Sequence, residues 1–270
     1  MSSNEPLILV NGSPEAAVSP MERGLAFGDG VFRTLRMENG QPVWWQEQLA
    51  KLEVDAHRLG LDMPPSSLWE QDIAWLAVRM PNAVVKLTLT RGPGPRGYRL
   101  PDLVFPTRIA MATPLPDFPD PTSETGARLR VCDLRLGHQP ALAGVKHLNR
   151  LENILARMEW DDPDIDEGLL LDGEGYVVSG VMSNLFVHRS GIWRTPLLDR
   201  CGVAGVTRGR LLHLLEAEEA RITLPDVLAA DALFLSNSLI RLRWVSALGE
   251  RRWRRPPDYD VILERLCSED

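Results

Sequence analysis

Lys146 lies in a sequence context suited to amine chemistry. It follows an irregular segment that contains Pro140 and Gly144, and it precedes an apolar-periodic run that predicts a helix, made of Leu148, Leu151, Ile154, Leu155 and Met158. We expect such a lysine to be held in place. Burial of a held lysine lowers the pKa of its ammonium and leaves a nucleophilic amine that can form a Schiff base. Spacing alone favours a surface lysine that happens to precede a helix, so the rest of the chain must overturn that interpretation.

A second chemical pattern is the loop 201–209, Cys-Gly-Val-Ala-Gly-Val-Thr-Arg-Gly, which opens into a helix expected from Val206 to Glu219. A helix start directs backbone N–H groups and the positive end of the helix dipole at one point, so an anion could bind there with the hydroxyl of Thr207. Helix starts after glycine are common, so the pattern is weak in isolation. The Rossmann, P-loop, HExxH and GxSxG motifs are all absent from the sequence.

The elements that must position these residues fall on either side of a proline-rich stretch. In the first half, alternating and apolar patterns predict strands at 7–10, 31–37, 83–90 and 107–112, with helices ending near Gly60 and covering 68–79. In the second half they predict strands at 127–132, 167–172, 176–180, 183–188 and 232–238, and a terminal helix at 261–266. Strands and helices mix without a βαβ rhythm, which indicates an α+β fold.

The proline-rich stretch suggests two domains. Residues 114–123 contain four prolines and are typical of a semi-rigid linker. We therefore expect a small N-terminal domain over 1–113 and a larger C-terminal domain of mixed β structure with flanking helices over 124–270.

Composition bounds the class of protein. The chain has 270 residues, 44% of them hydrophobic and 25% charged, as in an ordinary globular protein. The net charge of −7 argues against general nucleic-acid binding, and the basic cluster 251–255 is a short exception read as a solvated or subunit-facing turn. We find no targeting pattern and no apolar run that could cross a bilayer, so we expect a cytoplasmic protein without membrane contact. Cys132, Cys201 and Cys267 lack disulfide or zinc spacing, so no metal site is expected.

Taken in order, five motifs resemble the fold-type IV pyridoxal-phosphate enzymes over nearly the whole chain. The motifs are Phe27-Gly-Asp-Gly-Val-Phe32, Arg91-Gly-x-Gly-x-Arg-Gly-Tyr98, Leu142-Ala-Gly-Val-Lys-His-Leu-Asn-Arg150, Ser183-Asn-Leu-Phe186 and Gly205-Val-Thr-Arg208. That family contains branched-chain aminotransferases, D-amino-acid aminotransferases and aminodeoxychorismate lyases. The lysine motif and the Arg-Gly-Tyr loop look most like those of the lyases.

The resemblance implies a cofactor and the residues that hold it. Lys146 would bind pyridoxal 5'-phosphate through a Schiff base and later shuttle a proton. Val206 and Thr207 would bind the phosphate by backbone amides and hydroxyl, and Ser238 would add a second hydroxyl. Family members have the cofactor in a cleft between a small N-terminal and a larger C-terminal domain, and a homodimer completes each site.

Two positions depart from the family pattern. Where the family has a phosphate-binding arginine in a His-x-x-Arg-Leu motif, this chain has Lys51, which offers a point charge without the bidentate fork. Arg58 is a less suitable substitute. Where the family has a glutamate against the pyridine nitrogen, this chain has Ser179. A hydroxyl does not keep that nitrogen protonated, so the cofactor would be a weaker electron sink. We hypothesise that Ser179 biases the enzyme toward elimination, because a lyase that forms an aromatic product should tolerate a weaker sink.

The implied reaction converts 4-amino-4-deoxychorismate to 4-aminobenzoate and pyruvate in folate biosynthesis. Lys146 would remove the C4 proton, and Thr34 resembles a hydroxyl that the lyases place near the lysine. Because the substrate has two carboxylates, an acidic protein must concentrate positive charge locally. Arg96 and Tyr98 are the first candidates, followed by Arg91 and Arg33. Each arginine could equally be a solvated surface residue, and Tyr98 could be a packing residue.

Two other functions are compatible with the sequence. One is a D-amino-acid or branched-chain aminotransferase of the same fold, which the serine at position 179 and the Arg-Gly-Tyr loop disfavour. The other is a non-catalytic binding or scaffold protein, which the two departures make conceivable.

Overall fold

A computed structural model describes residues 5–118 and 120–268. The chain divides into two compact units, one comprising Met1–Phe118 with Val145–Asn149, and the other comprising Pro119–Gly144 with Arg150–Asp270. The first unit therefore contains the lysine segment, which comes from a part of the sequence that otherwise belongs to the second.

An antiparallel sheet in the order β1-β5-β4-β2-β3 forms the first unit. Its strands are β1 (Leu7–Val10), β2 (Gly30–Glu38), β3 (Gln41–Pro42), β4 (Ala83–Thr90) and β5 (Thr107–Pro114). The turn at Asn39 and Gly40, both with positive φ, joins β2 to β3 as a hairpin, as the Asn-Gly dipeptide predicts.

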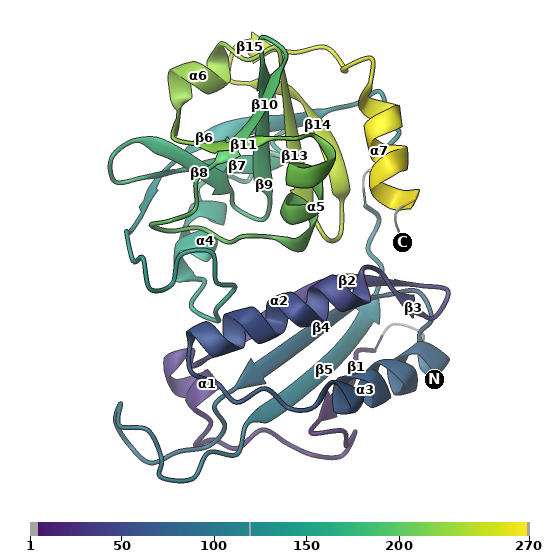
Figure 1. The fold of residues 1–270 in the computed structure, drawn as a ribbon, viewed down its shortest axis with the longest axis vertical. Helices are drawn as coiled ribbons and strands as arrows, with labels where there is room; N and C mark the ends of the chain where they lie inside the picture. Colours follow the sequence, from purple (N-terminus) through teal and green to yellow (C-terminus); the bar gives the residue numbers. More distant parts are fainter. Residues whose placement is uncertain (1–4, 119, 269–270) are drawn as a thin grey trace. The chain divides into compact units, whose positions relative to one another are not determined.

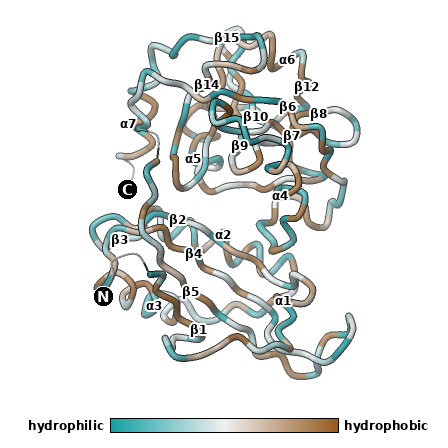
Figure 2. The backbone as a smooth tube through the Cα atoms, turned by 180° about the vertical axis from the view of Figure 1, so that it is seen from behind, coloured by the Kyte–Doolittle hydropathy of each residue, from teal (hydrophilic) through white to brown (hydrophobic). Residues whose placement is uncertain are grey.

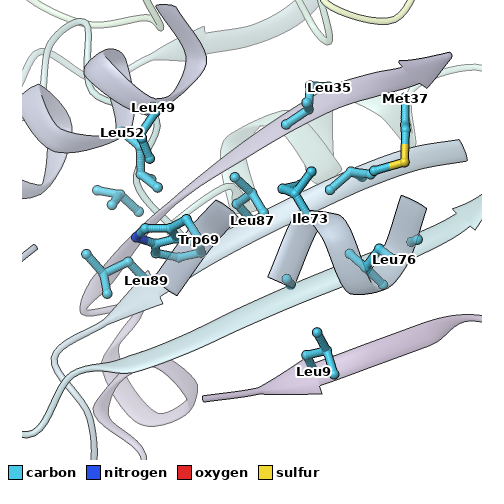
Figure 3. Packing of buried hydrophobic residues seen from close by; sticks show 14 of the residues in the cluster. Leu9, Leu35, Met37, Leu49, Leu52, Trp69, Ile73, Leu76, Leu87 and Leu89 are labelled. Carbon is cyan, nitrogen blue, oxygen red and sulfur yellow. The ribbon is translucent and has the colours of Figure 1, made fainter. Parts of the chain in front are cut away.

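Helices α2 (Trp45–Arg58) and α3 (Ser66–Arg79) cover one face of this sheet, and the short α1 (Arg23–Phe27) precedes β2 (Figure 1). Alternate residues of β2 and β4, such as Leu35 and Leu87, meet Leu52 and Trp69 in a fully buried core (Figure 3). The strands β4 and β5 appear as brown, hydrophobic stretches of the tube in Figure 2. The other face of the sheet carries the alternate side chains, among which Phe32, Thr34 and Lys86 are half-buried.

The second unit is built on a mixed sheet in the order β11-β10-β9-β13-β14-β6-β7-β8-β12, with β15 paired to β14. β6 runs parallel to both β14 and β7, and β10 runs parallel to β11, whereas the other pairs are antiparallel. The strands are β6 (Ala127–Leu136), β7 (Glu167–Asp172), β8 (Tyr176–Gly180), β9 (Asn184–Arg189), β10 (Ile192–Pro196), β11 (Glu218–Ala220), β12 (Ile222–Thr223), β13 (Ala232–Asn237), β14 (Arg241–Leu248) and β15 (Arg251–Arg252). The expected α+β fold is confirmed.

Helices α4 (Leu151–Arg157), α5 (Val206–Leu214), α6 (Leu224–Leu228) and α7 (Tyr259–Ser268) complete the second unit. The helix expected from Val206 to Glu219 is shorter than predicted, because the chain turns after Leu214 and Glu218–Ala220 pairs with β10 as β11. The apolar residues that predicted α4 do not form a buried face. The large side chains of α4 are exposed, and its buried residue is Ala156.

Candidate active site

The segment Val145–Asn149 lies along the free edge of β2. Phe32 N–H donates to the carbonyl of Lys146 at 3.0 Å, and Leu148 N–H donates to the carbonyl of Gly30 at 2.9 Å. Val145 is buried in the core of the first unit. The backbone on both sides of Lys146 is therefore fixed by hydrogen bonds to β2.

Two of the sequence motifs meet at this edge. Gly28 ends α1 with a φ of 65°, and a Cβ at this position would lie 2.2 Å from the Asn149 side-chain oxygen. A left-handed backbone and a close neighbour both require glycine here. Gly28, in the turn before β2, and Asn149, after the lysine, therefore pack directly against each other.

The side chain of Lys146 extends to the ring of Phe32, with Nζ 4.6 Å from the ring centroid. Lys86 of β4 approaches the same ring, with Nζ at 4.9 Å. Two amines therefore share one aromatic side chain on the half-buried face of the sheet. Sequence reasoning missed Lys86. The available signal was composition, since only three of the 30 Lys and Arg residues are lysines, namely Lys51, Lys86 and Lys146.

Thr34 lies on the same face of the sheet, two residues after Phe32. It pairs directly with Lys86 across the β2–β4 ladder and is half-buried. Residues opposite each other in an antiparallel pair have Cβ atoms about 4.5–5.5 Å apart. The hydroxyl of Thr34 thus belongs to the same group of side chains as the two lysines.

A buried carboxylate, Asp55 of α2, connects Lys146 to two further cations. Its Oδ2 accepts the backbone N–H of Lys146 at 3.1 Å and is also paired with Arg33, while its Oδ1 is paired with Lys51 one helical turn earlier. Asp55 and Arg33 are buried, whereas the Lys51 side chain remains 23% exposed. Burial lowers the pKa of Lys51, and Asp55 opposes that shift.

The Arg91–Tyr98 loop is held by a different ion-pair group. Asp29 Oδ2 accepts from both Arg91 Nε and Arg23 Nε at 2.9 Å, and Arg23 also donates to the carbonyls of Gly97 and Arg99. Burial opposes ionisation of Asp29, yet the hydrogen bonds from the two arginines hold its pKa below the usual value. Arg23 and Asp29 therefore anchor the loop, a role that the sequence did not reveal.

The four expected substrate-binding residues fall into two groups. Arg33 and Arg91 are buried, and their guanidinium groups are committed to Asp55 and Asp29, so both serve the structure of the unit. Arg96 is exposed, and Tyr98 is 84% exposed with its ring 5.3 Å from that of Phe27. These last two keep side chains that a ligand could reach.

In the second unit, the start of α5 offers an anion site. Gly205 is its N-cap and provides no side-chain cap, so the first-turn N–H groups have no side-chain acceptor there. Thr207 is fully buried, and its Oγ1 has no hydrogen-bond partner. A buried hydroxyl without a partner is unfavourable unless something binds it. This orphaned oxygen at a helix N-terminus fits a phosphate group.

The loop before α5 is fixed by the Ser-Asn-Leu-Phe strand and by the residues that lead to the lysine. Asn184 Nδ2 donates to the carbonyl of Val203, and its Oδ1 accepts from Gly205 N–H. Gly144 N–H donates to the carbonyl of Gly202 at 3.0 Å, and Ala204 N–H donates to the carbonyl of Gly144 at 3.1 Å. Asn184 is thus a structural residue of the loop, and Gly144 precedes Lys146 by only two residues in the chain.

Ser179 is buried near the end of β8, and its hydroxyl donates to the carbonyl of Gly180 at 2.8 Å. The turn that follows is organised by Glu167 of β7, which accepts hydrogen bonds from the N–H groups of Val181 and Met182 and from the Ser183 hydroxyl. Burial raises the pKa of Glu167. The buried carboxylate in this region therefore supports the turn beside Ser179, and sequence reasoning missed it.

Ser238, expected to bind phosphate, is half-buried in the turn after β13. Cys132 and Cys201 are unpaired, and burial raises the pKa of each thiol to about 11, so neither is a thiolate nucleophile at neutral pH. Within 5–118 and 120–268, no cluster of His, Cys, Asp or Glu could hold a metal ion, and no helix is long and apolar enough to span a membrane.

Comparison with known proteins provides the family. The model of the amino-transferase class IV family matches residues 30–248. The chain belongs to the class IV aminotransferase family. Aminodeoxychorismate lyase of Vibrio harveyi is 33% identical over 89% of this chain and 90% of its own length. A putative branched-chain-amino-acid aminotransferase of Methanocaldococcus jannaschii is 31% identical over 83% and 80%.

Solved structures share the fold of this class IV chain. The crystal structure of 4-amino-4-deoxychorismate lyase from Pseudomonas aeruginosa superimposes with a TM-score of 0.91, at 40% identity over 96% of this chain and 98% of that one. Branched-chain amino acid aminotransferase of Escherichia coli gives a TM-score of 0.82 at 21% identity, which shows the fold alone.

Proposed function

We propose that the protein is a pyridoxal-phosphate-dependent lyase that converts 4-amino-4-deoxychorismate to 4-aminobenzoate and pyruvate in folate biosynthesis. The observation that carries the proposal is the held amine of Lys146, together with the similarity to lyases at 33% and 40% identity over most of the chain. A D-amino-acid or branched-chain aminotransferase is the second candidate, because relatives with those names match at 31% and 29% identity.

The residues of each unit fit the cofactor. In the second unit, the buried Thr207 hydroxyl without a partner and the backbone amides at Val206 suit its phosphate, with Ser238 as an additional donor. In the first unit, Lys51 supplies a partly exposed cation and Lys146 the amine. We propose, from the family pattern alone, that both sets serve one cofactor molecule.

The residues of the chain would then divide the chemistry. When bound, the cofactor withdraws electrons from the carbon that bears the substrate amine. Lys146 Nζ would take the C4 proton, the C3–O bond would break with its electron pair leaving on oxygen, and the departing enolate would take up one proton at carbon to give pyruvate as the ring becomes aromatic. Thr34, on the same sheet face as the lysine side chain, is proposed to assist this proton transfer.

Ser179 is proposed to lie at the pyridine nitrogen, as the family pattern implies. A serine hydroxyl has one proton, which here is donated to the carbonyl of Gly180. It cannot supply the negative charge that keeps a pyridine nitrogen protonated. The cofactor would then be a weaker electron sink, which suits elimination to an aromatic product better than transamination.

The substrate carboxylates need local positive charge. We propose Lys86 as the main carboxylate ligand because its ammonium is half-buried on the sheet face that carries Phe32 and Thr34. Arg96 and Tyr98 are proposed to contribute from the anchored loop. The guanidinium groups of Arg33 and Arg91 are already paired, and we do not include them.

We further propose that the protein is a homodimer in the cytoplasm. Helix α4 and the turn beside it expose Leu151, Ile154, Leu155, Met158 and Met182, and Asn153 of α4 bonds the carbonyl of Val181 to hold the helix against that turn. A cluster of large exposed apolar side chains is typical of an interface. Three unpaired thiols are compatible with a reducing compartment.

Borohydride reduction tests the cofactor directly. The purified protein should be yellow, and reduction should abolish that colour and fix the cofactor to the peptide that contains Lys146. The Lys146→Ala variant should fold yet fail to be labelled. A colourless wild-type protein that takes up no cofactor would favour the non-catalytic alternative. Amino-group transfer from D-alanine or leucine at rates above pyruvate release would favour the aminotransferase.

A further inference from the structure

Asp55 stands at the centre of the first unit's charged cluster. It lies on α2, one turn after Lys51, and is fully buried. Its two oxygens are divided between three partners, with Lys51 at Oδ1 and with Arg33 and the Lys146 backbone N–H at Oδ2. One carboxylate therefore touches both the residue proposed to bind phosphate and the backbone of the amine-bearing residue.

The two cations bound to Asp55 have different tasks. Arg33 is buried on the core face of β2, and its guanidinium keeps its charge under all ordinary conditions. Lys51 is partly open to solvent, and an amine that is stripped of water loses its proton more readily. Of the two, Lys51 is the cation that could reach an anion and the one whose charge needs support.

The charges around Lys51 show where that support comes from. Asp55 and Arg58 act on Lys51 from its own helix and Arg33 acts from β2, while the 145–149 segment contacts Asp55 through the backbone N–H of Lys146. Burial, Arg33 and Arg58 all favour the neutral amine, whereas Asp55 favours the ammonium. Without Asp55, Lys51 would be a partly buried amine beside two arginines.

We propose that Asp55 is a positioning residue that keeps Lys51 as an ammonium, directed toward the cofactor phosphate and held at a fixed separation from the backbone of Lys146. The proposal rests on the proposed function, because it takes Lys51 as a phosphate ligand. It explains how a lysine can serve where the family pattern has arginine. Arginine holds its charge by itself, whereas this lysine needs a carboxylate partner.

The pH dependence of phosphate binding tests the proposal. Pyridoxine 5'-phosphate is a suitable probe because it lacks the aldehyde and cannot react with Lys146. Its affinity for the full-length protein freed of cofactor should fall as pH rises and Lys51 loses its proton. In Asp55→Asn the loss of affinity should begin at a lower pH. The affinity in neutral solution divided by the affinity in alkaline solution should therefore be several-fold larger than in the wild type. In Lys51→Arg the alkaline loss should disappear.

Matched controls separate a positioning role from a structural one. Asp72→Asn removes another buried carboxylate of the same unit, which is paired with Arg108 at 2.5 Å, and it should leave the pH profile unchanged. Pyridoxine without phosphate should bind Asp55→Asn and wild type with the same pH dependence. If Asp55→Asn does not fold, the Arg33→Met, Asp55→Asn double variant removes the buried pair as a unit and should show a shift in the same direction but smaller, because Arg33 no longer disfavours the Lys51 ammonium.

The outcomes are distinguishable. An Asp55→Asn profile that coincides with the wild type while Lys51→Arg changes it would overturn the role of Asp55. Wild-type protein that fails to bind pyridoxine 5'-phosphate at any pH would instead contradict the cofactor proposal itself.

Discussion

Lys146 and Lys86 approach one aromatic ring, and we propose a separate task for each of these two amines. Phe32 packs against both ammonium groups and contributes about 0.5–2 kcal/mol per contact. Lys146 is fixed through its backbone, whereas Lys86 belongs to the regular β2–β4 ladder. An amine that reacts and an amine that binds a carboxylate can therefore coexist on one face.

Replacing Lys86 with methionine should raise the KM for 4-amino-4-deoxychorismate about tenfold or more, because a charge-assisted hydrogen bond contributes about 1.5–3 kcal/mol. Steady-state kinetics would show the change, while the yellow colour and borohydride labelling stay intact. Lys86→Arg should recover part of the affinity. Arg36→Met serves as the control, since Arg36 shares the face but is paired with Glu38 at 2.9 Å. Equal KM values for Lys86→Met and wild type would remove Lys86 from the site.

Replacing Ser179 with glutamate should shift the balance of reactions. A carboxylate at the pyridine nitrogen would strengthen the electron sink, so the ratio of transamination to pyruvate release should rise about tenfold, the effect of a ~1.4 kcal/mol change in barrier. Both rates are measured side by side on one preparation. Equal loss of both reactions would contradict the proposed bias.

Sequence reasoning identified part of this residue-scale picture. The irregular approach to Lys146 predicted a held lysine, and its backbone is hydrogen-bonded to β2, whereas the anion site predicted at the loop before Val206 stays a prediction. Lys86 could not be identified from local pattern, because in an alternating strand a lysine is an ordinary solvent-facing residue. The burial and ion pairing of Arg33 and Arg91 also depend on Asp55 and Asp29, whose positions arise only from tertiary contacts.

At the scale of elements, the Arg91–Tyr98 loop depends on Asp29 and Arg23 for its shape. Asp29→Asn should leave both arginines with a weaker partner and loosen the loop, so trypsin should cleave after Arg96 and Arg99 several-fold faster. Limited proteolysis followed by mass spectrometry measures this rate. Asp102→Asn is the control, because its ion pair with Arg99 is almost fully exposed and contributes little. Unchanged cleavage in Asp29→Asn would show that the loop is held by other contacts.

The ends of strands and helices were predictable where the hydrophobic residues recur with a clear period. The strands at 83–90 and 167–172 match β4 and β7 because alternation or continuous burial ends at turn residues. The helix at 206 was overextended, since leucines at 211, 212, 214 and 215 mimic a longer apolar face although the chain leaves the helix to pair with β10. β14 was missed because arginines at 241 and 243 conceal its buried alternate residues.

At the scale of the whole molecule, the exposed face of α4 predicts the oligomeric state. Leu155→Glu places a charge within that apolar surface, so the variant should sediment as a monomer while the wild type sediments as a dimer. Analytical ultracentrifugation at several concentrations makes the comparison. Leu25→Glu is the control, because Leu25 is exposed on α1. A wild type that remains monomeric throughout would contradict the dimer proposal.

We propose that Lys146 carries out an elimination that releases two products from one substrate. An assay that follows 4-aminobenzoate by fluorescence and pyruvate by coupling to lactate dehydrogenase in the same reaction tests this proposal. We expect wild-type protein with 4-amino-4-deoxychorismate to form the two products in a one-to-one ratio and Lys146→Ala to form neither. Formation of a keto acid from D-alanine or leucine, with no 4-aminobenzoate from 4-amino-4-deoxychorismate, would contradict it.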